Sequence, residues 1–236
     1  MRKRSANNLT FDIVQRLGDE IVSGKYAGDA PFPTEAALCE EYDVSRSVMR
    51  EAVKMITSKG MLSARPRRGT KITQEENWNL LDPDVLTWLL KRDVSIPLMI
   101  EFTQARVGIE PEAAALAAQN ATEEQKHAII AAIENMEKAE RGERDPLETD
   151  IAFHLAVLDA SNNRFLIQLD GLIETALRFS IRMTNRLKGV RIASVTEHKD
   201  VADAILAGDA VKARAAMEYM QMEALKLFME NKIAGE

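Results

Sequence analysis

Three side chains in the second half of the chain have residue types that can hold a metal ion. Asp150 and His154 are four residues apart in ETDIAFHLAVL, so a helix would place both on one face. His198 adds a second imidazole. A carboxylate with two imidazoles suits Zn, Ni, Mn or a similar divalent ion. A hydrogen-bonded Asp–His pair lining a core would have the same spacing, so spacing alone leaves both interpretations open.

A second group of side chains is basic and lies near the N-terminus. Arg46 and Arg50 are one helical turn apart and would project from one face. A guanidinium there can contact guanine O6 and N7 in bidentate fashion, or a phosphate. The segment RPRRG adds Arg65, Arg67 and Arg68 beside Gly69. These three could reach a minor groove or a DNA backbone, although either group could also be a solvated surface.

The charge distribution supports a polyanion partner for the N-terminal part alone. The first 73 residues contain 13 Lys+Arg and 9 Asp+Glu, a net charge of +4. The remaining residues contain 18 Lys+Arg and 28 Asp+Glu, a net charge of −10. A basic front and an acidic back indicate that the front binds nucleic acid. The apolar runs are interrupted by charge, so we expect no transmembrane helix.

The elements that would position the arginines are short. We expect helices at 10–23, 35–42 and 46–59, then two strands, MLSA and TKIT, around the arginine-rich tip. Ser45 can cap the third helix, and Asp43-Val44 forms a tight turn before it. Two helices joined by a tight turn and followed by a basic hairpin predict a winged helix-turn-helix, with the third helix in the major groove.

Beyond Thr73 the pattern changes. QEENWNLLDP is typical of a linker, in which Trp78 and Trp88 would pack at the domain junction. The apolar pattern of the remaining sequence predicts helices at 84–92, 96–118, 122–141, 147–161, 164–187, 193–207 and 209–231. The expected fold class is therefore mainly α, with an N-terminal winged helix-turn-helix (1–74), a linker and first helix (75–94) and a C-terminal all-α helical bundle (95–236).

The N-terminal motif resembles a known family. Residues 8–73 are similar to the DNA-binding domain of GntR-type regulators, through Pro33, Glu35, Leu38, Val44-Ser45-Arg46 and Arg50-Glu51-Ala52. The resemblance implies DNA contacts from Ser45, Arg46, Ser47, Arg50, Arg65, Arg67, Arg68 and Gly69. Many members of the FadR-type branch have a DNA-contacting arginine just after the motif glutamate. This chain has Ala36 there, so one contact is absent or supplied differently.

The C-terminal part resembles the FCD effector-binding domain of the same branch. The pattern of Asp, three residues and His stands at Asp150 and His154, and the later Glu-His-Lys stands at 197–199. The Asn, Arg and Glu positions of this domain family stand at Asn163, Arg106 and Glu110. It implies an effector site of Arg106, Asp150, His154, Asn163 and His198. It further implies a divalent metal such as Zn on Asp150, His154 and His198.

One position departs from this pattern. The fourth ligand of the family would stand at Met220, whose thioether is a poor partner for a hard ion. We therefore expect metal binding to be weak or absent. Arg106 could then clamp an anionic effector without metal. The alternative role of Arg106 is a salt bridge to Glu110, one turn away.

These observations predict a transcription regulator rather than an enzyme. We expect a homodimeric repressor that binds a palindromic double-stranded operator and releases it when a small carboxylate binds. The linker resembles that of sugar-acid regulators of this branch, which favours an aldonate or uronate. The single cysteine, Cys39, gives no disulfide framework, as expected in the cytoplasm.

Two other hypotheses remain open from the sequence. Asp150, His154 and His198 could form the metal centre of an enzyme acting on small carboxylates, but no separate nucleophile or acid–base pair accompanies them. The chain could also be a DNA binder that responds to no ligand.

Overall fold

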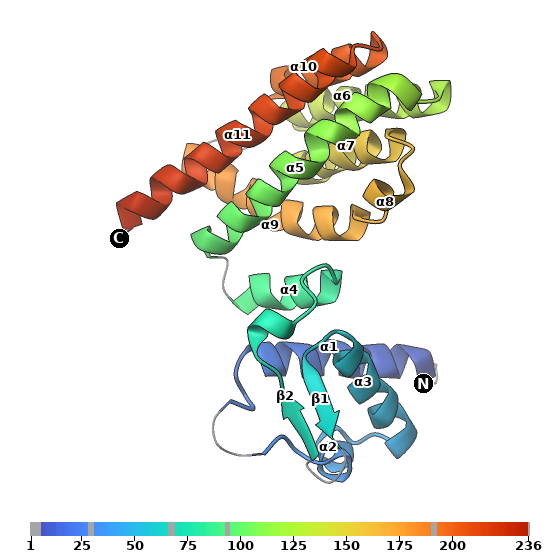
Figure 1. Ribbon diagram of the computed structural model, residues 1–236, viewed down its shortest axis with the longest axis vertical. Helices are drawn as coiled ribbons and strands as arrows, with labels where there is room; N and C mark the ends of the chain where they lie inside the picture. Colours follow the sequence, from blue (N-terminus) through green and yellow to red (C-terminus); the bar gives the residue numbers. More distant parts are fainter. Residues whose placement is uncertain (1–5, 28–30, 66–68, 93–94, 190–192, 236) are drawn as a thin grey trace. The chain divides into compact units, whose positions relative to one another are not determined.

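Eleven α-helices and one two-stranded sheet make up the described part of the chain (Figure 1). The computed structural model describes residues 6–27, 31–65, 69–92, 95–189 and 193–235. The chain divides into two units, Met1–Asp93 and Val94–Glu236. The predicted fold class, mainly α with a winged helix-turn-helix and an all-α bundle, is confirmed. No helix within the described ranges is long and apolar enough to cross a membrane.

The N-terminal unit begins with the elements of the predicted winged helix-turn-helix. These are α1 (Ala6–Val22), α2 (Glu35–Tyr42), α3 (Arg46–Ser58), β1 (Leu62–Arg65) and β2 (Gly69–Ile72). Thr34 and Ser45 cap α2 and α3, since their side-chain oxygens accept hydrogen bonds from backbone N–H groups in the first turn. Asp43, with φ 51°, makes the left-handed turn between these helices. The two strands are antiparallel.

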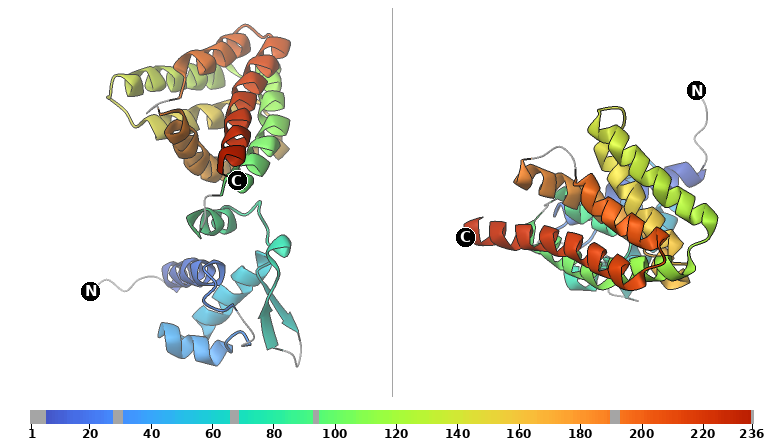
Figure 2. Two further views of the ribbon diagram at one scale, coloured as in Figure 1. Left: turned by 90° about the vertical axis from the view of Figure 1, so that its left-hand side faces the viewer. Right: turned by 90° about the horizontal axis from the view of Figure 1, so that it is seen from above.

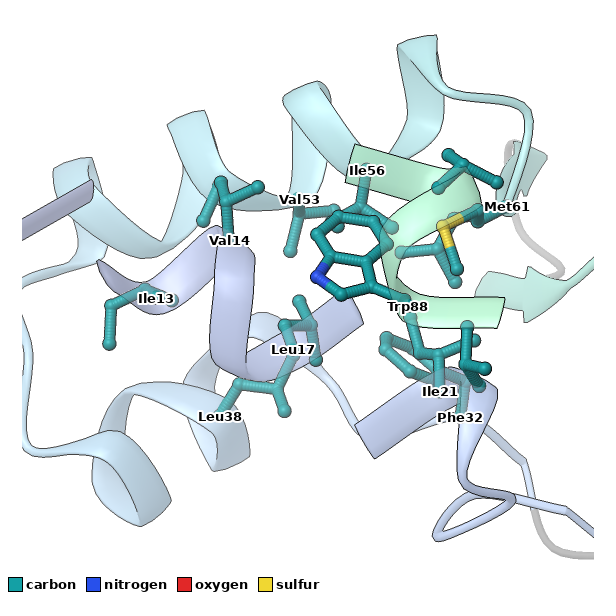
Figure 3. Packing of buried hydrophobic residues seen from close by; sticks show 14 of the residues in the cluster. Ile13, Val14, Leu17, Ile21, Phe32, Leu38, Val53, Ile56, Met61 and Trp88 are labelled. Carbon is teal, nitrogen blue, oxygen red and sulfur yellow. The ribbon is translucent and has the colours of Figure 1, made fainter. Parts of the chain in front are cut away.

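The segment after β2 is part of the N-terminal unit and packs against its helices. It contains a short 3-10 helix (Glu75–Asn77) and α4 (Pro83–Arg92). Trp88 of α4 is 1% exposed, and Figure 3 shows its indole among side chains of α1 and α3, including Leu17 and Ile56. The indole N–H donates to Gln15 Oε1 at 3.1 Å. Both tryptophans therefore lie in the core of this unit.

A partly buried group of one lysine and two carboxylates connects the end of α3 to the start of α4. Lys59 Nζ lies 2.7 Å from both carboxylate oxygens of Asp82 and 2.9 Å from Asp84 Oδ2. The Lys59 side chain is only 10% exposed, so its ammonium depends on these two carboxylates. The described part (75–92) of the predicted linker and first helix (75–94) is thus held by a charged and an apolar contact.

The described part of the C-terminal unit consists of seven helices. They are α5 (Ile96–Asn120), α6 (Glu123–Glu140), α7 (Pro146–Ala160), α8 (Arg164–Ile167), α9 (Asp170–Lys188), α10 (Val195–Leu206) and α11 (Ala210–Gly235). The sequence predicts a single helix at 164–187, and this prediction is wrong. Gln168 and Leu169 separate α8 from α9: Gln168 keeps right-handed helical backbone angles, but Leu169 departs from them with φ −88° and ψ 1°. A break of two residues hardly disturbs the apolar periodicity, so periodicity did not reveal it.

Helix α5 positions the candidate effector residues. It packs along α11 and also contacts α7 and α10 (Figures 1 and 2). Five of its eleven buried residues are alanines near its C-terminal end, which allow close helix packing: Ala113, Ala114, Ala115, Ala117 and Ala118. Two charged residues, Arg106 and Glu110, lie on the same buried side. The bundle core is therefore apolar at one end and polar at the middle of α5.

Gly18 of α1 provides the space that Trp88 occupies, which gives a first prediction. A Cβ at Gly18 would lie 2.4 Å from the indole. Gly18→Ala gains about 1 kcal/mol of helix propensity, but overpacking of a buried ring costs about 1–3 kcal/mol. We expect a net loss of stability. The chain has two tryptophans, both in this unit, so urea unfolding followed by tryptophan fluorescence reports on this unit.

Asp19→Ala, at the next, exposed position of α1, is the matched control and should change the midpoint little. A Gly18→Ala variant as stable as the wild type would show that the indole does not depend on this glycine.

Candidate functional site

The first candidate site is the N-terminal end of α3. Ser45 Oγ accepts a hydrogen bond from Val48 N and lies 3.0 Å from Ser47 Oγ. Arg46, Ser47 and Arg50 are all exposed. Arg46 has no hydrogen bond or ion pair within the described chain, whereas Arg50 Nε lies 3.7 Å from Glu35 Oε2. The first turn thus presents one free and one loosely paired guanidinium, together with backbone N–H groups that suit a phosphate.

The second part of this site is the hairpin formed by β1 and β2. Arg65 ends β1 and its backbone is paired with Gly69, which has φ +76° and begins β2. Glycine adopts a positive φ at no steric cost, so Gly69 suits this turn position. Arg67 and Arg68 lie outside the described residues.

The second candidate site is a cavity of about 290 Å³ in the C-terminal unit. Four residues expected from the sequence line it: Arg106 from α5, Asp150 and His154 from α7, and His198 from α10. The other lining residues come from α9, α10, α11 and the segment before α10: Ser180, Ile181, Thr184, Asn185, Lys188, Ala193, Ser194, Glu197, Met220, Gln221, Ala224 and Phe228. The structure thus brings together residues spread over more than half of the sequence.

Glu110 is the centre of a buried polar network behind this cavity. Its carboxylate accepts hydrogen bonds from Arg106 Nε at 2.5 Å and from Gln221 Nε2 at 2.7 Å. His154 Nδ1 lies 2.7 Å from Glu110 Oε2, although the ring direction does not give hydrogen-bond geometry. Burial alone would raise the pKa of Glu110, but the charges of Arg106 and His154 outweigh burial and lower it to about 2. Glu110 is therefore ionised and holds side chains from three helices.

Asp150 and the two histidines form the innermost group. His154 Nε2 and His198 Nε2 each lie 3.3 Å from Asp150 Oδ1. His198 Nδ1 is 2.8 Å from the Ser194 carbonyl oxygen, which can only accept, so Nδ1 carries the proton. The other ring nitrogen, His198 Nε2, faces the Asp150 carboxylate. Asp150 Oδ1 and His198 Nε2 are buried without a hydrogen-bond partner.

The ionisation of this group follows from its neighbours. Burial opposes the charge of Asp150, but its contacts with His154 and His198 keep its pKa below the ordinary range. Burial lowers the pKa of His154, but the charge of Glu110 and the contacts with Asp150 and Glu110 together outweigh burial, so its pKa is raised. One guanidinium and two carboxylates sum to −1, or to zero with a protonated His154. The buried groups therefore carry no excess positive charge for an anion.

Asn163 differs from its assignment in the sequence analysis, whereas Met220 and Arg106 lie at the cavity. Asn163 is not among the lining residues; its Oδ1 accepts a hydrogen bond from Phe165 N and caps α8. Met220, at the expected fourth ligand position, lines the cavity and is 9% exposed. Arg106 both lines the cavity and makes the salt bridge to Glu110.

Gln221 is a residue that sequence reasoning missed. It is 1% exposed and donates to Glu110. Its signal was weak, because a single amide next to Met220 on a long helix resembles any surface glutamine. Only the buried carboxylate on α5 gives it a role.

Two family models match the chain over the parts that form these sites. The model described as "Bacterial regulatory proteins, gntR family" matches residues 9–72, and the "FCD domain" model matches residues 101–221. The chain belongs to the GntR family, in the branch that carries an FCD domain. The predicted family is confirmed, and with it the expectation of a transcription regulator rather than an enzyme.

Full-length relatives agree with this assignment. The GntR-family chain is 32% identical over 205 residues to the uncharacterized HTH-type transcriptional regulator YieP of Escherichia coli, covering 86% of this chain and 87% of the relative. It is 34% identical over 199 residues to the galactonate operon transcriptional repressor of Escherichia coli, covering 84% and 87%. A solved structure of Streptococcus agalactiae GntR shares the fold, with 24% identity, 92% and 99% coverage and a TM-score of 0.51.

The exposed arginines of α3 give a second prediction for this GntR-family regulator. Arg46→Ala or Arg50→Ala should weaken binding to DNA by about 1–3 kcal/mol if the arginine reads a base. The probe is a duplex selected from a random library by the wild-type protein, and fluorescence anisotropy at fixed salt measures the affinity.

Arg141→Ala is the control, because Arg141 is an exposed arginine of the C-terminal unit. It should leave affinity for the duplex unchanged. Unchanged affinity in both α3 variants would show that another surface reads the DNA.

Proposed function

We propose that this regulator is a repressor whose affinity for its operator falls when a small carboxylate binds in the C-terminal cavity. The observation that carries the proposal is the contact between Asp150 Oδ1 and His198 Nε2, two buried atoms 3.3 Å apart that have no hydrogen-bond partner. Either a proton or a metal ion between them would satisfy both atoms. The fixed groups of the cavity are therefore arranged for a bound cation and, beside it, an anion.

The residues present fit a divalent metal such as Zn. Asp150, His154 and His198 are buried and offer ligand atoms within 4.8 Å of one another. Glu110 beside His154 Nδ1, and the Ser194 carbonyl beside His198 Nδ1, are outer-shell partners of the kind that orient imidazole ligands. A divalent ion supplies a Lewis acid for a carboxylate oxygen and changes the sum of buried charge from −1 to +1. With Met220 at the fourth position, we expect weaker binding than in a four-ligand site.

The rest of the cavity suits a polyhydroxy acid. Its wall contains hydroxyl, amide and carboxylate groups, namely Ser180, Thr184, Asn185, Ser194, Glu197 and Gln221. Such groups donate to and accept from sugar hydroxyls, while Ile181, Ala224 and Phe228 provide an apolar side. The relative that is a galactonate operon repressor makes an aldonate the first effector to test.

The DNA-binding part of the proposal concerns symmetry. A single winged unit offers few base contacts, so we propose that a homodimer binds a palindromic operator with two such units. The cytoplasm, where the bacterial DNA lies, is the proposed location.

The metal component gives a third prediction. After treatment with chelator, the wild-type chain should bind one equivalent of Zn²⁺ in a calorimetric titration. Asp150→Asn or His198→Gln should weaken this by more than about 10-fold, because each removes a ligand. His127→Gln is the matched control, since His127 is the third histidine and is exposed on α6. Equal Zn²⁺ affinity in all four proteins would exclude this ligand set.

The effector component gives a fourth prediction. D-galactonate should raise the melting temperature of the metal-loaded chain, since saturation at about 100 Kd stabilises a folded protein by about 2.7 kcal/mol. Arg106→Ala with His154→Ala should abolish this shift. Galactonate should also lower affinity for the selected duplex.

A panel of aldonates, uronates and unrelated carboxylates identifies the effector if galactonate is silent. No shift with any acid, with or without metal, would contradict a carboxylate effector. Turnover of an acid by the purified protein would revive the enzymatic alternative.

A further inference from the structure

A second cavity of the C-terminal unit lies next to the cavity lined by Arg106 (the Arg106 cavity). It has a volume of about 400 Å³ and lies between the start of α7 and the C-terminal half of α9, two helices that pack together (Figure 1). Ile181 and Asn185 line both cavities. The rest of the wall of this α7–α9 groove is formed by Asp145, Pro146, Leu147, Arg182 and Arg186. The groove and the Arg106 cavity are therefore neighbours along α9.

Two arginines dominate the chemistry of the groove. Arg182 and Arg186 are one helical turn apart, so their side chains leave the same side of α9. Both are exposed, and neither makes a hydrogen bond or an ion pair with another residue of the described ranges. Arg178, one turn earlier, instead pairs with Glu148 and Glu174. The two groove arginines thus keep their donors available for an anion.

The charge of the groove is positive, although its surroundings are acidic. Asp145 is the acidic residue of its wall, and its Oδ1 accepts a hydrogen bond from Leu147 N as the cap of α7. One carboxylate and two guanidiniums give the groove a charge of +1. The sequence beyond Thr73 carries −10, and the buried groups of the Arg106 cavity sum to −1 or zero. Before a metal is bound, a small anion is therefore attracted to the groove rather than to the Arg106 cavity.

The groove lies at the same end of α9 as the opening of the Arg106 cavity. Ser180, in the wall of that cavity, is 1% exposed, whereas Lys188, two turns further along α9, also lines it and is exposed. The wall of the Arg106 cavity thus passes from buried to exposed in the direction of Arg186. An anion held by the groove arginines is accordingly next to the opening.

We propose that the α7–α9 groove is a second anion site, at which Arg182 and Arg186 bind the carboxylate of a small organic acid before the acid enters the Arg106 cavity. This inference rests on the proposed carboxylate effector and adds a step that its buried residues cannot perform, because they carry no excess positive charge without metal. The planar guanidinium matches the two oxygens of a carboxylate. Exposed ion pairs are weak and screened by salt, so the acid exchanges rapidly and can move on.

Arginine side-chain NMR of the full chain follows the two sites separately, because each has arginines of its own. The probe is D-galactonate, and galactitol, which lacks the carboxylate, is its neutral counterpart. At low salt D-galactonate should shift the Nε–Hε signals of Arg182 and Arg186, and galactitol should not. The shifts should disappear at about 1 M salt, where the Debye length is about 3 Å. Arg164 is the internal control, as an exposed arginine of α8 that lines neither cavity.

The rate at which the acid releases the selected duplex tests the order of the two steps. Arg182→Gln with Arg186→Gln should lower the second-order rate constant of D-galactonate-triggered release by about 10-fold at low salt, since charge focused at a cleft raises association rates by about 10–1000-fold. The equilibrium affinity for the acid should change less, because the groove is passed before the final site. Arg164→Gln should leave the rate unchanged, and circular dichroism should show the same helix content in all variants.

The arginine signals also separate failure of this inference from failure of the proposed function. A response of Arg106 to D-galactonate without one at Arg182 and Arg186 would overturn the groove site alone, as would an unchanged release rate in the double variant. A response of the groove arginines without one at Arg106, for every acid of the panel, would contradict the proposed effector and with it the entry step. No response at either site to any acid would overturn both.

Discussion

A single buried carboxylate organises the C-terminal unit. Glu110 is 3% exposed and contacts Arg106 on its own helix, His154 on α7 and Gln221 on α11. An isolated carboxylate in this position would be strongly unfavourable, so the bundle requires all three partners. Each partner also lines the cavity. The stability of the fold and the arrangement of the cavity thus depend on the same ion-pair network.

The sequence predicted the features that depend only on residues close together in the chain. Capping by Ser45, the turn at Asp43 and the outward positions of Arg46 and Arg50 follow from short-range chemistry. The i, i+4 spacing likewise placed Asp150 and His154 on one face of α7. The meeting of His198 with Asp150 was accessible through family resemblance, since no local signal joins residues so far apart in sequence.

Features with non-local causes were missed or only partly predicted. The segment 75–92 has the composition of a linker, but Trp88 fits against Gly18 and Lys59 pairs with Asp82. Both contacts join positions more than 20 residues apart, so neither changes the local pattern. The break between α8 and α9 was not predicted because apolar residues continue through it, so the pattern indicated one continuous helix. Gln221 could be recognised only once Glu110 was known to be buried.

Met220, at the fourth ligand position that the family resemblance implies, has a thermodynamic consequence for the proposed function. A site with four protein ligands would hold its metal whether or not an effector is present. With Asp150, His154 and His198 alone, a donor from the cavity side must complete the coordination. Binding of the effector carboxylate and of the metal would then be linked, each raising the affinity of the other by the same factor. Met220, as a weak donor at this position, would make the regulator more dependent on its effector than a site with four protein ligands would be.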